Sequence, residues 1–277
     1  TYALAYAGLA DAYHELSDSS PPREMMPKAK AAAMRALEMD DSLAEAHAAL
    51  GWVKWQYDWD WSGAEKEFQR AIGLNPNYAI AHGMYALYLT SLGRVDEGMA
   101  ELKRALELDP LSLIISANLG DVFQFSRHYN QAIEQYNKTL EMDKNFALAY
   151  RSLSDAYWNN GMYADAVRAW QKSLITEGSS QLAAKMGEAY SRSGYKGALQ
   201  AWLQYSIGSS NRAYLAPASV AAVYLRLGEE EHAFEWLEKA YQAHDGWLVY
   251  LKVDPSFDNL RSDPRYADLL RRMGLPQ

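Results

Sequence analysis

AIGLNP at residues 71–76 and ALELDP at residues 105–110 are two copies of one pattern, and they lie 34 residues apart. The same spacing relates a set of small residues and a set of large apolar residues: Ala64, Gly98, Ala132 and Ala166, and Phe68, Leu102, Tyr136 and Trp170. A fixed period of this length is typical of stacked supersecondary units. The sequence therefore predicts an internal repeat through the middle of the chain.

Each repeat has the pattern of a helix, a tight turn and a second helix. Within residues 132–140 the apolar side chains fall at i, i+1, i+4 and i+8, which is one face of a helix. Glycines recur where the turn between paired helices needs a residue with positive φ: Gly93, Gly161, Gly194 and Gly228. Asn75-Pro76 and Asp109-Pro110 end second helices, because the residue before proline is biased away from the helical region.

The chain resembles a tetratricopeptide repeat protein, on the strength of Leu50-Gly51 and the two six-residue stretches quoted above. The resemblance covers almost the whole sequence. It implies an all-α fold in which helix pairs stack into a right-handed superhelix. We expect a repeat array over residues 1–246 with about seven units, at approximately 3–41, 44–77, 79–112, 113–146, 147–179, 180–212 and 214–246.

The pattern changes after residue 246, where we expect a C-terminal cap over residues 247–277. Asp254-Pro255 and Asp263-Pro264 indicate two turns, and a short helix follows from about Arg265 to Arg272. Such a helix is needed because the last repeat of an array exposes an apolar face. The tail resembles the ends of arrays in bacterial multidomain signalling or transcriptional regulators. Together with the first residue, Thr1, it suggests the C-terminal part of a longer regulator.

Composition excludes several classes of function. The 277 residues include no cysteine, so disulfides and thiolate chemistry are ruled out. The net charge of -8 argues against a nucleic-acid surface. No stretch approaches the ~18 apolar residues of a membrane span. We therefore expect a soluble protein, cytoplasmic rather than periplasmic, that neither binds nucleic acid nor inserts into a membrane.

The resemblance implies that the first helix of each pair lines a concave groove. The groove positions begin one residue after the recurring small residue and return three or four residues later. The partner-binding residues that we expect are Asp11, Trp52, Trp55, Gln56, Leu87, Asp121, Gln124, Phe125, Arg151, Asp155, Trp158, Asn159 and Glu188. Two interpretations stay open for them, since the tryptophans are also suited to packing and the carboxylates to solvated positions.

Tetratricopeptide domains that bind the acidic C-termini of heat-shock chaperones use a Lys and an Asn four residues apart on a first helix. The corresponding pairs here carry other residues, as in Ala7 with Asp11 and Ala48 with Trp52. Because carboxylates repel an acidic tail, we expect a basic or aromatic-bearing protein or peptide as the partner.

A catalytic role has no support in the sequence. The six histidines are scattered, and His47 and His82, at equivalent repeat positions, are expected in the core. No catalytic, phosphate-binding or dinucleotide-binding motif occurs, so we expect neither an enzyme nor a metal or cofactor. The sequence thus favours a protein-interaction or regulatory module. Two alternatives remain: a small-molecule sensor with a closed pocket around Trp52, Trp55 and Leu87, and a self-association scaffold.

Overall fold

A computed structural model describes residues 2–17, 19–208 and 214–275, and within these ranges the regular structure is entirely helical. The helices follow one another as pairs: α1 (Tyr2–Leu16) and α2 (Pro22–Met39), α3 (Ala44–Val53) and α4 (Trp61–Leu74), α5 (Ala79–Ser91) and α6 (Val95–Leu108), α7 (Leu113–Phe125) and α8 (Tyr129–Met142), α9 (Ala147–Asn159) and α10 (Tyr163–Thr176), α11 (Ser180–Gly208), and α12 (Pro217–Leu227) and α13 (Glu230–Ala243).

The predicted turn and stop signals are confirmed. Gly93, Gly161 and Gly228 have φ of 83°, 77° and 81°, a region that a side chain with Cβ rarely occupies. The second helices α4 and α6 end immediately before Asn75 and Asp109. Local sequence therefore fixes where these helices begin and end.

The second helix pair contains one extra residue near its turn, and a π-helical turn accommodates it. A π-helical turn, η1 (Lys54–Asp58), continues α3, and Trp59 then takes a left-handed conformation with φ 54°. The Asp60 side chain caps α4 by accepting a hydrogen bond from the Gly63 amide at 3.0 Å. The insertion leaves Trp55 and Trp59 on the side of the pair that meets the C-terminal segment.

The α11 region holds two helical pieces joined at a kink. Ser193 has φ -138° and Gly194 has φ 63°, so the expected turn is present as a break within α11. The expected junction between residues 212 and 214 lies partly outside the described residues.

Neighbouring pairs are joined by one recurring interface. In the fourth pair, Ile115 and Val122 of α7 pack against Leu102 and Ala105 of α6. In the fifth, α9 packs in the same way on α8. The first helix of each of these two pairs is therefore covered by the preceding pair, and small residues at these sites allow close approach.

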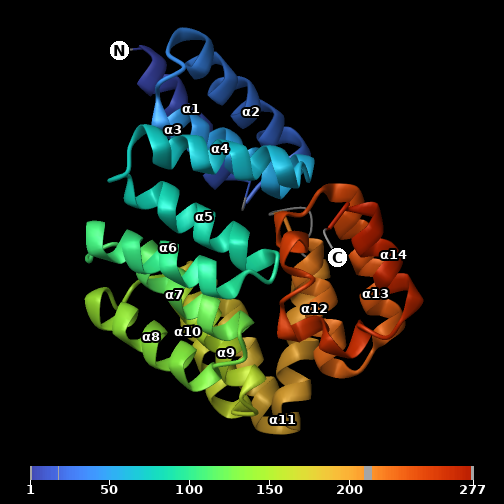
Figure 1. The fold of residues 1–277 in the computed structure, drawn as a ribbon. Helices are drawn as coiled ribbons and strands as arrows, with labels where there is room; N and C mark the ends of the chain where they lie inside the picture. Colours follow the sequence, from blue (N-terminus) through green and yellow to red (C-terminus); the bar gives the residue numbers. More distant parts are fainter. Residues whose placement is uncertain (1, 18, 209–213, 276–277) are drawn as a thin grey trace.

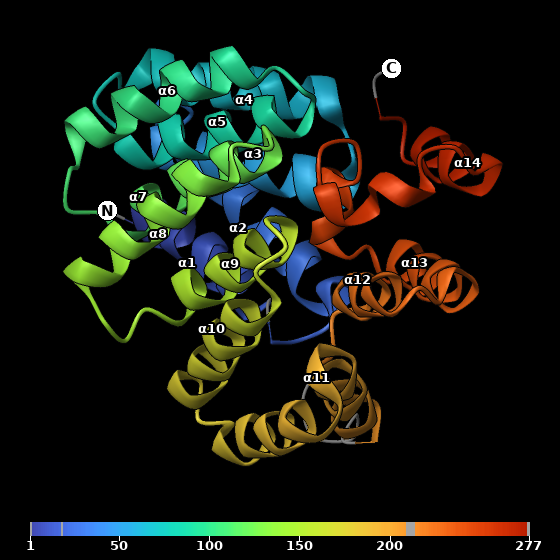
Figure 2. The same cartoon turned by 90° about the horizontal axis from the view of Figure 1, so that it is seen from below.

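The stack bends far enough that its two ends approach each other. Figure 1 shows the pairs descending from α1 and α2, turning at α11 and returning through α12 and α13 toward α4. After α13 the chain forms two short 3₁₀ helices, η2 (Gly246–Tyr250) and η3 (Pro255–Leu260), and then α14 (Pro264–Arg272). Figure 2 shows α12, α13 and α14 together on one side of the arc.

The segment from η2 to Leu275 does more than cover the last pair. Arg265 and Arg272 hold it to Glu231 and Glu238 of α13, each at 2.8 Å. It also reaches the second pair, where the Trp61 indole N–H donates to the Met273 carbonyl at 2.9 Å. The segment at residues 246–275, called the closing segment below, thus joins the two ends of the arc.

Candidate functional site

The closing segment packs on the concave side of the early helix pairs. Tyr250 meets the ring of Trp55 at 5.6 Å between centroids and the ring of Phe125 at 4.9 Å. Trp55 is 0% exposed, and Leu87 and Tyr250 are each 6% exposed within the same apolar cluster. This part of the expected groove is therefore filled by the protein's own chain.

Polar contacts fix the segment in the same place. The Arg127 guanidinium donates to the Val253 carbonyl and forms an ion pair with Asp258 at 2.7 Å. Just before the segment, the His244 ring stacks on Trp59 at 4.5 Å between centroids. Arg127, in the turn after α7, thus holds the middle of this stretch, and Trp59, directly after η1, contacts the residue that precedes the stretch by two positions.

The thirteen residues expected in the groove fall into three environments rather than one site. The buried ones are Trp55, Leu87, Gln124 and Phe125. The half-buried ones are Asp11, Trp52, Gln56, Asp121, Asp155, Trp158 and Asn159, and the exposed ones are Arg151 and Glu188. Only the last two groups present surface that a partner can contact.

Two of the expected residues are engaged by a helix distant in sequence. Arg226 of α12 forms an ion pair with Asp155 at 2.6 Å, and its guanidinium lies 5.1 Å from the Trp158 ring centroid. Arg226 was not predictable from the sequence, because its proximity to α9 depends on the closure of the arc. Here the Asp155 and Trp158 side chains serve an internal contact.

Asp121 is also used internally. The Tyr136 hydroxyl donates to its carboxylate at 2.6 Å. Burial raises the pKa of Asp121 to about 6, with a further contribution from nearby Asp155, while the hydrogen bond from Tyr136 opposes the rise. A carboxyl in this setting acts as a hydrogen-bond acceptor inside the fold.

The first two helix pairs carry an acidic region beside Trp52, which itself packs against the cluster that holds the closing segment. Burial raises the pKa of Asp11 to about 6, and the neighbouring carboxylates of Glu15 and Glu45 raise it further. Beside it, burial lowers the pKa of His14 to about 4, and its ring meets Trp52 edge-on at 4.8 Å. This region combines three neighbouring carboxyl groups with an aromatic wall.

A polar bridge recurs within the second, third and fourth helix pairs. His47 contacts Glu67 at 2.6 Å, and at the equivalent positions His82 contacts Glu101 at 2.6 Å. In the fourth pair the Gln135 amide donates to the Ser116 hydroxyl at 2.9 Å. These bridges account for both histidines as residues that join paired helices.

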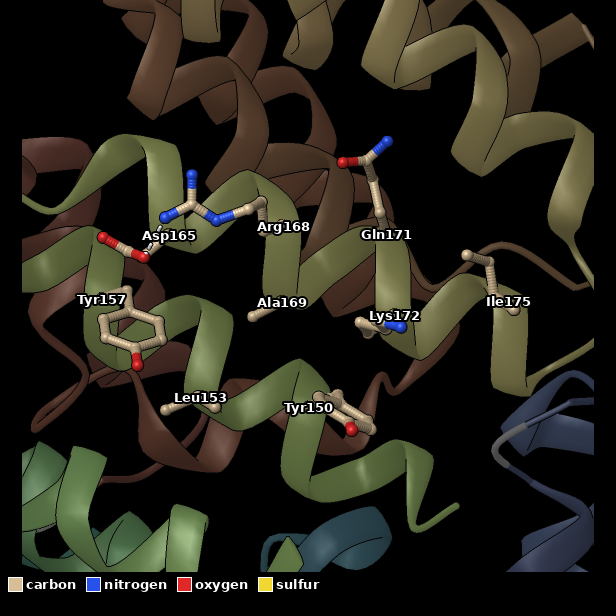
Figure 3. Close-up of a pocket in the computed structure, with 9 residues that line it drawn as sticks. All are labelled: Tyr150, Leu153, Tyr157, Asp165, Arg168, Ala169, Gln171, Lys172 and Ile175. Atoms are coloured by element: carbon tan, nitrogen blue, oxygen red, sulfur yellow. Dashed lines mark hydrogen bonds and ion pairs between the residues drawn. The ribbon is translucent and has the colours of Figure 1, made fainter. Parts of the chain in front are cut away.

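The fifth pair lacks this bridge and is hollow there. Tyr150 and Ala169 occupy the two bridge positions, and a cavity of about 360 Å³ opens between α9 and α10 (Figure 3). Its lining is Tyr150, Leu153, Tyr157, Asp165, Arg168, Ala169, Gln171, Lys172 and Ile175. This cavity was not among the features predicted from the sequence, although Ala169 stands 34 residues after a glutamine and 68 after a glutamate.

Neither metal binding nor membrane insertion finds support in the described ranges. No cluster of three or more His, Asp or Glu side chains there is placed to hold a metal ion. Within residues 2–17, 19–208 and 214–275, no helix is long and apolar enough to cross a membrane.

Known proteins share both the repeat and the fold of this chain. Residues 60–112 and 118–181 match the tetratricopeptide repeat family. The solved structures similar to this chain include TTC0263, a tetratricopeptide protein of Thermus thermophilus. That structure has a TM-score of 0.59 and 15% identity, over 72% of this chain and 99% of that one. The protein is therefore a helical solenoid, and its residues 60–112 and 118–181 form tetratricopeptide repeats.

One further similar structure covers nearly the whole chain, and one curated relative covers about a quarter of it. PilW, a type IV pilus biogenesis factor, has a TM-score of 0.53 and 16% identity over 94% of this chain and 98% of that one. Hsp70-Hsp90 organizing protein 3 of Arabidopsis thaliana is 32% identical over 75 residues, which are 27% of this chain. The chain spans 13% of the length of that relative.

Proposed function

We propose that the chain is a protein-interaction and regulatory module that holds a partner protein or peptide on the uncovered part of its concave face. Tetratricopeptide repeats characteristically bind other proteins, and the acidic region at α1 and α3 carries the proposal for this chain. There burial and the nearby charges of Glu15 and Glu45 raise the pKa of Asp11. A cationic side chain placed among these three carboxyl groups relieves their repulsion.

The covered part of the concave face is a poor alternative. The closing segment is tethered to the array, so it competes with an effective concentration of about millimolar against any free partner. A free peptide would also have to replace the contacts of Tyr250 with Trp55 and Phe125. We therefore place the partner at the α1 and α3 end, next to His14 and Trp52.

The chemistry of this region favours a basic or aromatic-bearing partner over an acidic one. The positions that would hold an acidic C-terminus carry Ala7 with Asp11, and Ala48 with Trp52. The likeness to the Hsp70-Hsp90 organizing proteins therefore supports the repeat and peptide binding in general, while the side chains here differ from those expected of an acidic-tail binder.

A peptide array followed by calorimetry tests the proposal. We expect Lys- or Arg-containing peptides to bind, and Asp11→Asn or Glu45→Gln to weaken the affinity by about tenfold, or about 1.4 kcal/mol. Glu107→Gln, an exposed carboxylate of α6, is the matched control and should leave affinity unchanged. Preferential binding of acidic C-terminal peptides would overturn the proposal.

A small-molecule sensor is less well supported by the geometry. That function required a closed pocket around Trp52, Trp55 and Leu87. Trp55 and Leu87 are instead buried in the same cluster as the closing segment. The suggestion that the array belongs to a longer bacterial regulator rests on resemblance, and an open reading frame beginning at or just before Thr1 would contradict it.

A further inference from the structure

The cavity between α9 and α10 lies where the second, third and fourth helix pairs carry a polar bridge. The first bridge position holds Tyr150 here and histidine or serine in those pairs, and the second holds Ala169 in place of glutamate or glutamine. An alanine side chain is too short to span the gap between two paired helices. The missing bridge therefore leaves a volume of about 360 Å³ open (Figure 3).

The floor of this cavity is apolar, and its rim carries an exposed apolar side chain. Leu153 and Ala169 are 4% and 6% exposed, whereas Ile175 at the rim is 49% exposed. Figure 3 shows the rings of Tyr150 and Tyr157 on either side of Leu153. These side chains favour an apolar ligand group, because its burial removes apolar surface from water.

Lys172, which also lines the cavity, lacks the ion pair that its equivalents form. Arg104 and Lys138, at the same position of the third and fourth pairs, contact glutamates of their own helices at 3.2 Å and 2.7 Å. Those two glutamate positions hold Ile175 and Arg168 in the fifth pair. Among the residues that the structure describes, no carboxylate forms an ion pair with Lys172. The fifth pair therefore presents an uncompensated positive charge at an apolar cavity.

The remaining polar groups of the lining add a donor and no net charge. The Tyr150 hydroxyl makes no hydrogen bond with any residue in the described part of the chain. The ion pair of Arg168 with Asp165 is neutral overall. An ammonium group and a phenol O–H both donate hydrogen bonds, and a carboxylate accepts both. The polar groups thus favour a ligand that carries a carboxylate.

The shape of the cavity suits a small molecule better than a peptide. Its lining comes from α9 and α10 alone, so it does not continue as a groove over the neighbouring helix pairs. An extended peptide would fill it with a single side chain. Small-molecule sites have volumes of about 300–1,000 Å³. The volume of about 360 Å³ lies within that range.

We propose that this cavity binds a small amphipathic carboxylate. Its apolar group lies against Leu153 and Ala169, and its carboxylate accepts hydrogen bonds from Lys172 and the Tyr150 hydroxyl. The site belongs to a different helix pair from the acidic region at α1 and α3, and it selects the opposite charge. It is therefore independent of the proposed partner site.

Methyl NMR of the intact chain tests the proposal with 3-phenylpropionate as the probe. We expect shifts at the methyl groups of Leu153, Ala169 and Ile175, with a Kd of about 1 mM for a ligand of about eleven non-hydrogen atoms. The uncharged analogue 3-phenylpropionamide should bind about tenfold more weakly, because it lacks the charge that pairs with Lys172. Unshifted methyl groups at about 10 mM probe, or equal binding of the two probes, would overturn the proposal.

Two variants locate the site. Lys172→Gln should weaken 3-phenylpropionate binding about tenfold and leave amide binding unchanged, and Lys138→Gln in the fourth pair is the matched control. Ala169→Glu introduces the residue that the second and third pairs carry there and should abolish binding. Binding that survives Ala169→Glu, or that falls equally in both lysine variants, would contradict this site. Asp11→Asn should leave the affinity unchanged, which separates this result from a failure of the proposed partner site.

A third probe separates a small molecule from a protein side chain. An acetylated tripeptide of glycine, phenylalanine and glutamate carries the same ring and carboxylate on a peptide backbone. We expect it to bind no more tightly than 3-phenylpropionate, because its backbone lies outside the cavity. An affinity more than about tenfold higher for the tripeptide would assign the cavity to a protein partner and overturn the proposal.

Discussion

The concave face of α3, α5 and α7 and the outer face of α1 are both apolar, but only the first is covered. Trp55 on the concave face is 0% exposed, whereas Tyr2 on the outer face of α1 is 79% exposed. The closing segment makes the difference, because it returns from the far end of the array to contact η1, α4 and α7. Covering a face in this solenoid depends on which distant segment reaches it.

The two faces also differ in how much their side chains contribute to the stability of the fold. Burying one large apolar side chain stabilises a fold by about 1.5–3 kcal/mol. The rings of Trp55, Phe125 and Tyr250 together form part of the core. The exposed side chains of α1, such as Tyr2, contribute little of this kind to the described chain.

The largest effect is expected from truncating the closing segment's central aromatic residue. Tyr250→Ala removes the ring between Trp55 and Phe125 and should lower the free energy of unfolding by about 3–5 kcal/mol. Urea denaturation measures this. The matched variant Tyr2→Ala should cost less than about 0.5 kcal/mol, because Tyr2 is exposed. Similar losses in the two variants would remove the distinction between the faces.

A smaller effect is expected where α12 meets α9. Arg226→Ala breaks the ion pair with Asp155 and the contact with the Trp158 ring, and should cost about 2–3 kcal/mol, because the guanidinium is almost buried. Arg192→Ala, which removes an exposed pair with Glu188 on α11, should cost less than about 0.5 kcal/mol. Thermal unfolding of both variants checks the difference, and an equal shift would argue against closure at α12.

The hydrogen bond between the ends of the arc gives a finer test. Trp61→Phe leaves the Met273 carbonyl without its indole donor and should cost about 1–2 kcal/mol. Amide hydrogen exchange should become faster in α14. Trp247→Phe is the control, since that ring is 42% exposed. Unchanged exchange in α14 would show that Trp61 does not hold the closing segment.

The smallest effect concerns the acidic region of α1. The pKa of Asp11 is about 6 in the folded chain, above its ordinary value of 3.8, so its ionisation destabilises the fold as pH rises between these values. Asp11→Asn should therefore stabilise the protein by about 1 kcal/mol at pH 8, after allowance for partial solvent screening, and by almost nothing below about pH 4. Unfolding across this pH range, compared with Glu107→Gln, isolates the contribution of Asp11. A pH-independent difference would contradict the assignment.

The repeat period and the local stop signals were enough to predict the helix pairs. Pro76 and Pro110, with the turn glycines, act within a few residues of themselves, so their effect is readable from sequence. The contact of Tyr250 with Trp55 was not readable, because it joins positions 195 residues apart and depends on small rotations added over several pairs.

The candidate site was predictable only in part for the same reason. The groove positions follow from the repeat, and Asp11 and Trp52 do present partly open surface. Phe125 is buried against Tyr250 of the closing segment, for which a local cap was expected. The cavity beside Ala169 was in principle readable, since the residue interrupts a polar bridge that recurs every 34 residues.

Residue-specific hydroxyl-radical footprinting of the intact chain tests most directly whether the closing segment fills the concave face. It compares oxidation of Trp55 with that of Trp247, two tryptophans that differ in exposure as 0% and 42%. The structure predicts that Trp55 is oxidised far more slowly than Trp247 until the protein unfolds. Equal oxidation of the two under native conditions would show that the concave face is open and would contradict closure of the arc.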